Sequence, residues 1–68
     1  MEIQLTKQLK FKFDWGFEQN GIYYYGTIQL PDDPRGKVRI EWDSDVPDNW
    51  EDIEDKIIDM ANDEVSKF

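Results

Sequence analysis

The 68-residue sequence contains no cysteine and no histidine. Without cysteine the chain forms no disulfide and no thiolate metal site, which fits a reducing compartment, so we expect a cytoplasmic protein. Without histidine it lacks the commonest metal ligand and the commonest general base. No apolar run approaches the roughly 20 residues of a membrane span, so no membrane partner is expected. Together these absences favour a protein that is not an enzyme and has no cofactor.

Ten aromatic residues compensate for the missing crosslinks. Each aromatic ring can bury roughly 150–250 Å², and a chain this short needs efficient burial to fold. We expect one domain over residues 1–68, because the length leaves no room for a second hydrophobic core.

The acidic residues are concentrated toward the C-terminus. Residues 1–40 carry six Lys/Arg and five Asp/Glu, whereas residues 41–68 carry two Lys and eleven Asp/Glu, within a net charge of −8. An acidic field of this kind repels nucleic acid and anionic membrane surfaces unless a local basic patch overrides it.

Alternating apolar residues predict a first strand over about 3–17 and a second over about 22–30, joined by the turn signal Asn20-Gly21. A two-residue loop pairs residues whose numbers sum to 41, and every resulting pair joins two core-facing positions. The predicted pairs are Phe17 with Tyr24, Trp15 with Gly26, Phe13 with Ile28, and Phe11 with Leu30.

A third strand is predicted over about 37–43, after a loop with two prolines and a glycine that cannot continue a ladder. If the core-facing residues of the second and third strands pair with each other, Trp42 lies beside Gly26 on the side opposite Trp15. We therefore expect the rings of Trp15 and Trp42 to cover Gly26, with Trp50 packed nearby.

Apolar residues at three- and four-residue steps predict a helix over about 48–67, opened by a capping-box-like pair of Asp48 and Glu51. The predicted fold is α+β, with a three-stranded antiparallel meander and one C-terminal helix packed on one face, giving two layers in the order βββα. This leaves one sheet face open. We expect either residues 2–9 to fold over part of it, or a symmetric homodimer through an edge strand or the open face.

Four aspartates form the main candidate site. At about 100° per residue they share one helix side opposite the apolar stripe, over about 16 Å of helix length. Like charges at this spacing are mutually destabilising, so the pattern favours a basic protein surface as partner, including an inhibitor that mimics DNA phosphates. The aspartates are Asp52, Asp55, Asp59 and Asp63. The alternative is an ordinary acidic surface that favours solubility.

The open sheet face offers a second candidate, a nucleic-acid-binding surface that combines basic residues with exposed tyrosines. Acidic residues on the same face dilute its potential, and cross-strand charge pairs on a solvated face are the alternative interpretation. The candidate residues are Lys10, Lys12, Tyr23, Tyr25, Lys37 and Arg39.

The segment from Asp43 to Glu54 has carboxylates at several positions of a calcium-binding loop. Pro47 occupies the fifth position of such a loop and Asp48 the sixth, where a sharp turn requires glycine, and a strand precedes the segment in place of a helix. A strand-to-helix connection rich in capping residues explains the pattern better. We predict no metal site and no catalytic residues.

Overall fold

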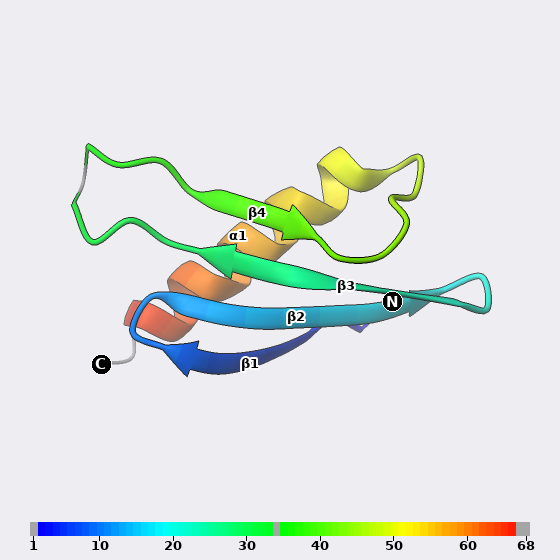
Figure 1. The fold of residues 1–68 in the computed structure, drawn as a ribbon, viewed down its shortest axis with the longest axis horizontal. Helices are drawn as coiled ribbons and strands as arrows, with labels where there is room; N and C mark the ends of the chain where they lie inside the picture. The colour runs from blue at the N-terminus through cyan, green and yellow to red at the C-terminus, as the bar shows by residue number, and fades with distance from the viewer. Residues whose placement is uncertain (1, 34, 67–68) are drawn as a thin grey trace.

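The computed structural model describes residues 2–33 and 35–66, in which four antiparallel strands are followed by one helix (Figure 1). The predicted α+β class, the meander and the C-terminal helix are confirmed, with one strand more than expected. The sheet order β1-β2-β3-β4 follows the sequence. The elements are β1 (Gln4–Leu9), β2 (Lys12–Gln19), β3 (Ile22–Gln29), β4 (Arg39–Trp42) and α1 (Trp50–Ser66).

The β2–β3 hairpin has the predicted turn and register. Asn20 and Gly21 both adopt positive φ, 55° and 79°, as expected for a two-residue turn that matches the twist of the strands. Trp15 pairs with Gly26, and the rest of the ladder keeps the same register. Phe11 lies just outside the ladder, where its carbonyl accepts a hydrogen bond from the Leu30 amide at 2.8 Å.

The expectation of one strand over about 3–17 is wrong, because the chain reverses at Lys10 and Phe11 and β1 pairs antiparallel with β2. Phe11 adopts a φ of 67°, which is unusual for a bulky residue. The β1–β2 register shifts between Lys7 and Leu9, so Leu9 turns away from the core and is 66% exposed. Gln4–Leu9 extends the edge of the sheet, and the expectation that this segment covers the open face is also wrong.

The predicted row of Trp15, Gly26 and Trp42 is confirmed across β2, β3 and β4. The two indole rings meet edge to face, with centroids 4.6 Å apart and planes at 77°. Trp50 does not join them: it is 40% exposed at the start of α1. β4 is shorter than the predicted 37–43.

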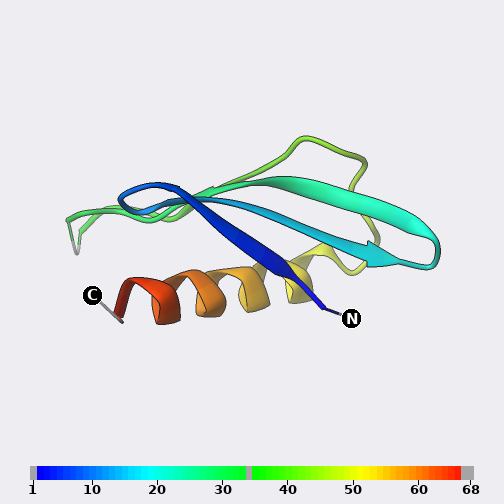
Figure 2. The ribbon, with the colours of Figure 1, turned by 90° about the horizontal axis from the view of Figure 1, so that it is seen from below.

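Helix α1 covers one face of the sheet, and no helix lies on the other face of the described sheet (Figure 2). The core forms between the helix and the covered face, where the sheet contributes aromatic and branched side chains. Its largest fully enclosed side chains are Phe13, Phe17, Ile28, Ile53 and Ile57.

The helix begins two residues later than predicted. Its first hydrogen bond runs from the Ile53 amide to the Asn49 carbonyl at 3.3 Å, which places Asn49, and not Asp48, at the capping position. The predicted last residue, Lys67, lies outside the described residues. On the sheet side, the indole Nε1 of Trp42 donates to Oε2 of Glu54 at 2.9 Å and ties the helix to β4.

Candidate functional site

The orientation of α1 is fixed by its apolar stripe. Ile53, Ile57 and Ala61 are buried against the sheet, so the opposite side of the helix faces outward. The four predicted aspartates are all exposed. The last lies eleven residues after the first in the sequence, which is about 16 Å along the helix at 1.5 Å per residue. We call this set, Asp52, Asp55, Asp59 and Asp63, the acidic ridge.

The electrostatics of the acidic ridge oppose helix stability. Its members are three or four residues apart, where like charges repel by a few tenths of a kcal/mol per pair. The last turn of α1 contains no basic residue up to Ser66, where the described helix ends, although cations are favoured near a helix C-terminus. Lys56 borders the acidic ridge: it is four residues after Asp52 and three before Asp59, about 40° and about 60° around the axis from them by the same helical geometry. The outward side is therefore mainly anionic, with Lys56 as the one described cation beside the acidic ridge.

The basic residues predicted for the open face lie toward one end of the sheet, but Lys10 lines a hollow with Phe13 and Val65 on the side covered by the helix. Lys12, Gln29 and Arg39 form one cross-strand row through β2, β3 and β4. Lys10 lies in the β1–β2 turn with its Nζ 5.3 Å from the centre of the Phe11 ring. Lys37 precedes β4 and is exposed.

The two tyrosines lie toward the other end of the same face. Tyr23 and Tyr25 are 56% and 45% exposed, and their rings stack with centroids 5.9 Å apart and planes at 22°. Asp14, Thr27 and Glu41 form the row between them and the basic row. The Tyr25 row and the Lys12 row are four residues apart, about 13 Å at 3.3 Å per residue. Two carboxylates thus interrupt the predicted nucleic-acid track.

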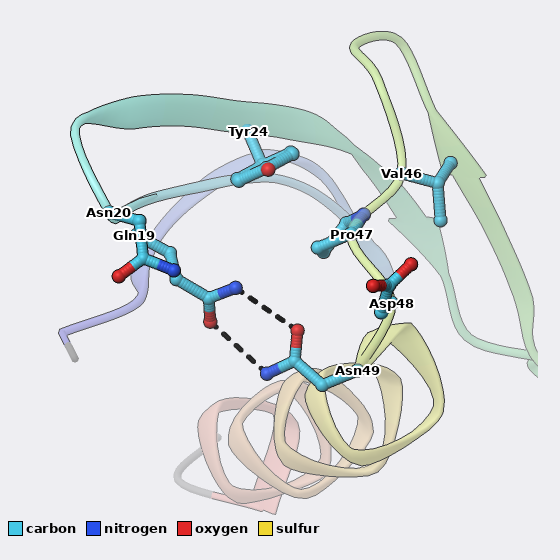
Figure 3. A pocket seen from close by; sticks show the side chains of 7 residues that line it. All are labelled: Gln19, Asn20, Tyr24, Val46, Pro47, Asp48 and Asn49. Atoms are coloured by element: carbon cyan, nitrogen blue, oxygen red, sulfur yellow. Dashed lines mark hydrogen bonds between the residues drawn. The ribbon is translucent and has the colours of Figure 1, made fainter.

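A polar hollow of about 680 Å³ lies where the β2–β3 turn approaches the start of α1 (Figure 3). The side-chain amides of Gln19 and Asn49 exchange two hydrogen bonds across it, at 3.0 and 3.1 Å. Sequence reasoning missed this pair because 30 positions separate the two residues and neither belongs to a recognisable motif. Asp48 is the one carboxylate in its lining, and the other lining residues are Gln19, Asn20, Tyr24, Val46, Pro47 and Asn49.

Two residues at ligand positions of the calcium-loop pattern, Asn49 and Glu54, make hydrogen bonds elsewhere in the fold, and so does the neighbouring Ser44. Ser44 Oγ accepts a hydrogen bond from the Tyr25 amide at 2.9 Å, Asn49 pairs with Gln19, and Glu54 accepts from Trp42. Among residues 2–33 and 35–66, no three His, Cys, Asp or Glu side chains are grouped to hold a metal ion. These contacts make the segment a strand-to-helix connection.

Comparison with known proteins found no matching family model, no matching curated protein and no matching solved structure. Within the described part of the chain, α1 is the only helix, and it is neither long enough nor apolar enough to cross a membrane.

Proposed function

We propose that the protein is a non-catalytic binding module whose acidic ridge engages a basic surface of another protein. The observation that carries the proposal is the division of α1 into a buried side, with Ile53 and Ile57 at most 1% exposed, and an outward side with four exposed aspartates. A helix optimised only for stability would place more lysine or arginine than the single Lys56 among these carboxylates, and would place some in the last turn.

The chemistry of the partner follows from the shape of the acidic ridge. A straight row of carboxylates about 16 Å long suits a row of lysine or arginine side chains. Surfaces that bind DNA have such rows because each strand presents a phosphate about every 3.4 Å. One partner of this class is a DNA-binding protein, which the acidic ridge would inhibit by occupying its phosphate contacts.

The test compares two variants of equal net charge. The first replaces Asp52, Asp55, Asp59 and Asp63 with Asn. The second removes four exposed carboxylates outside the helix, through Glu18→Gln, Asp32→Asn, Asp43→Asn and Asp45→Asn. The probe is a labelled peptide of about eight lysines, measured by fluorescence anisotropy at low salt and near physiological salt, where charges are screened over about 8 Å.

We expect the first variant to lose most of the binding and the second to retain most of it. The first should also remain folded, because neutral side chains relieve the repulsion along the helix. Equal losses in both variants would show that net charge alone drives binding, and would contradict the acidic ridge as the site.

The stacked and exposed Tyr23–Tyr25 pair favours a second candidate, single-stranded nucleic acid on the open sheet face. Labelled single-stranded DNA and RNA therefore belong in the same experiment. Retardation of either by the native protein near physiological salt, with loss in Lys12→Ala combined with Arg39→Ala, would favour this surface over the acidic ridge.

A further inference from the structure

The outer edge of β4 differs from the other edge of the sheet. The order β1-β2-β3-β4 leaves β1 and β4 as edge strands, whose outward N–H and C=O groups can pair with another strand. β1 contains a register irregularity and a lysine, Lys7, on its helix-facing side, and both features discourage pairing. β4 pairs with β3 in regular register, without a bulge or a proline.

The backbone of β4 determines which groups face the open edge. The Asp43 amide donates to the Tyr25 carbonyl at 2.9 Å, so Asp43 bonds toward β3. Because bonding alternates along an antiparallel strand, Arg39 and Glu41 also bond toward β3. The N–H and C=O groups of Ile40 and Trp42 consequently point to the open edge, and an extension of the strand adds those of Val38.

The side chains around Ile40 would complement the same segment of a second copy in charge and in apolar character. We propose that the protein forms a homodimer in which β4 pairs antiparallel with β4 of a second copy, about a two-fold axis at Ile40. Residues whose numbers sum to 80 then face each other. The pairs are Ile40 with Ile40, Arg39 with Glu41, Val38 with Trp42, and Lys37 with Asp43.

Other symmetric registers place like charges together. A two-fold axis at Arg39 or at Glu41 places that charged residue opposite the same residue of the second copy. A centre at Val38 opposes Lys37 to Arg39, and a centre at Trp42 opposes Glu41 to Asp43. The centre at Ile40 makes every charged pair opposite in sign and every apolar pair apolar on both sides. In this register Ile40 lies on the two-fold axis and must exchange N–H···O=C bonds with Ile40 of the second copy. Its backbone N–H and C=O groups face the open edge, as this exchange requires.

Apolar surface beside the edge supports the same contact. Val38 is 37% exposed, and with the half-buried Ile58 it helps to line a hollow of about 500 Å³ between β4 and α1. Figure 1 shows the N-terminal end of α1 extending past the outer side of β4, so the helix borders the same edge. Pairing of Val38 with Trp42 of the second copy covers this surface. The contact involves a different surface from the acidic ridge and does not depend on the proposed function.

The test is sedimentation of the native chain and of charge-swap variants near physiological salt. Arg39→Glu and Glu41→Arg should each weaken dimerisation roughly tenfold or more, because the two-fold axis turns two opposite-charge pairs into like-charge pairs at once. The double variant Arg39→Glu/Glu41→Arg restores opposite charges and should recover the dimer. Within one copy, residues 39 and 41 face Gln29 and Thr27, which are neutral, so the swaps should leave the fold intact.

A second measurement reads the register directly. Dimerisation should slow hydrogen exchange at the amides of Val38, Ile40 and Trp42, and leave exchange at Arg39 and Glu41 almost independent of concentration. Lys12→Glu lies on the same face two strands away and should leave the dimer unchanged. A native chain that stays monomeric at millimolar concentration would overturn the proposal, and so would a dimer that neither single swap weakens or that the double swap fails to recover.

Discussion

Gly16 and Gly26 are both buried in the sheet, but different groups close the space beside them. A Cβ on Gly26 would overlap the backbone carbonyl oxygen of Glu41 and lie 2.6 Å from Cζ2 of Trp15. A Cβ on Gly16 would meet the phenol end of Tyr23, with Cζ at 2.8 Å. The backbone of a paired strand cannot move aside, whereas an exposed tyrosine can change rotamer. The sheet therefore requires glycine at 26 more strictly than at 16.

We expect Gly26→Ala to lower the free energy of unfolding by about 1–3 kcal/mol through overpacking. Gly16→Ala should cost less than about 1 kcal/mol, because only the Tyr23 side chain must move. Urea denaturation followed by tryptophan fluorescence gives both values. A Gly26→Ala variant as stable as the native protein would show that β3 and β4 are not as close as the structure places them.

Helix α1 is held to the sheet by polar contacts at its first turns as well as by its apolar stripe. Glu54 accepts the indole hydrogen of Trp42, and Asn49 pairs with Gln19 at the tip of the β2–β3 hairpin. The indole nitrogen of Trp15, by contrast, is buried without a hydrogen-bond partner among the described residues. Trp42 thus serves both as a core ring and as a donor that orients the helix.

Replacing Glu54 with Leu should cost about 1–2 kcal/mol, because a half-buried indole donor loses a charged acceptor. Glu54→Gln retains an acceptor oxygen and should cost clearly less. Glu51→Leu, at an exposed position in the same helix, controls for helix propensity and surface charge. Thermal and urea unfolding of the three variants provide the comparison, and equal losses in Glu54→Leu and Glu54→Gln would show that the hydrogen bond does not stabilise the fold.

Charge is unevenly distributed over the protein. Eleven of its sixteen carboxylates belong to residues 41–68, and the acidic ridge accounts for four of them on one exposed helix side. Self-repulsion of this kind destabilises the compact state and is reduced by salt. The fold therefore carries an electrostatic cost that depends on the solvent.

The melting temperature should rise when the ionic strength increases from about 0.01 M to about 0.15 M, because the screening length falls from about 30 Å to about 8 Å. The variant with four Asn in the acidic ridge should respond less, since part of the repulsion is already removed. Calorimetry at a fixed protein concentration is the suitable measurement. A salt response of equal size in both proteins would place the repulsion outside the acidic ridge.

The sequence predicted the β2–β3 hairpin, its register and the glycine between two tryptophans, because Asn20-Gly21 fixes the turn and apolar parity fixes the faces. The prediction of a single strand over about 3–17 was wrong. The turn at Lys10 and Phe11 contains no glycine, proline or asparagine, so no turn residue signals it.

The odd–even alternation of apolar residues also hid the turn at Lys10 and Phe11. Leu9 faces Lys12 beside the turn, and Lys7 faces Phe13 after the register shift. The turn alone would pair odd-numbered residues of β1 with even-numbered residues of β2, and the bulge shifts the pairing by one residue, so that odd again faces odd. The one-residue shifts of the turn and the bulge cancel over most of β1, so the apolar residues alternate as they would in one long strand.

The acidic ridge was predictable from helical spacing, whereas the polar hollow depends on distant residues that only the folded chain brings together.

The order of the strands has a consequence for how the chain acquires its structure. Each strand pairs only with the strand next to it in the sequence, so every ladder closes a short loop and the entropic cost of each closure is small. Strand addition can therefore begin at the Asn20-Gly21 turn and spread outward, one neighbour at a time. Topologies dominated by such local pairings fold faster than those that must join distant segments.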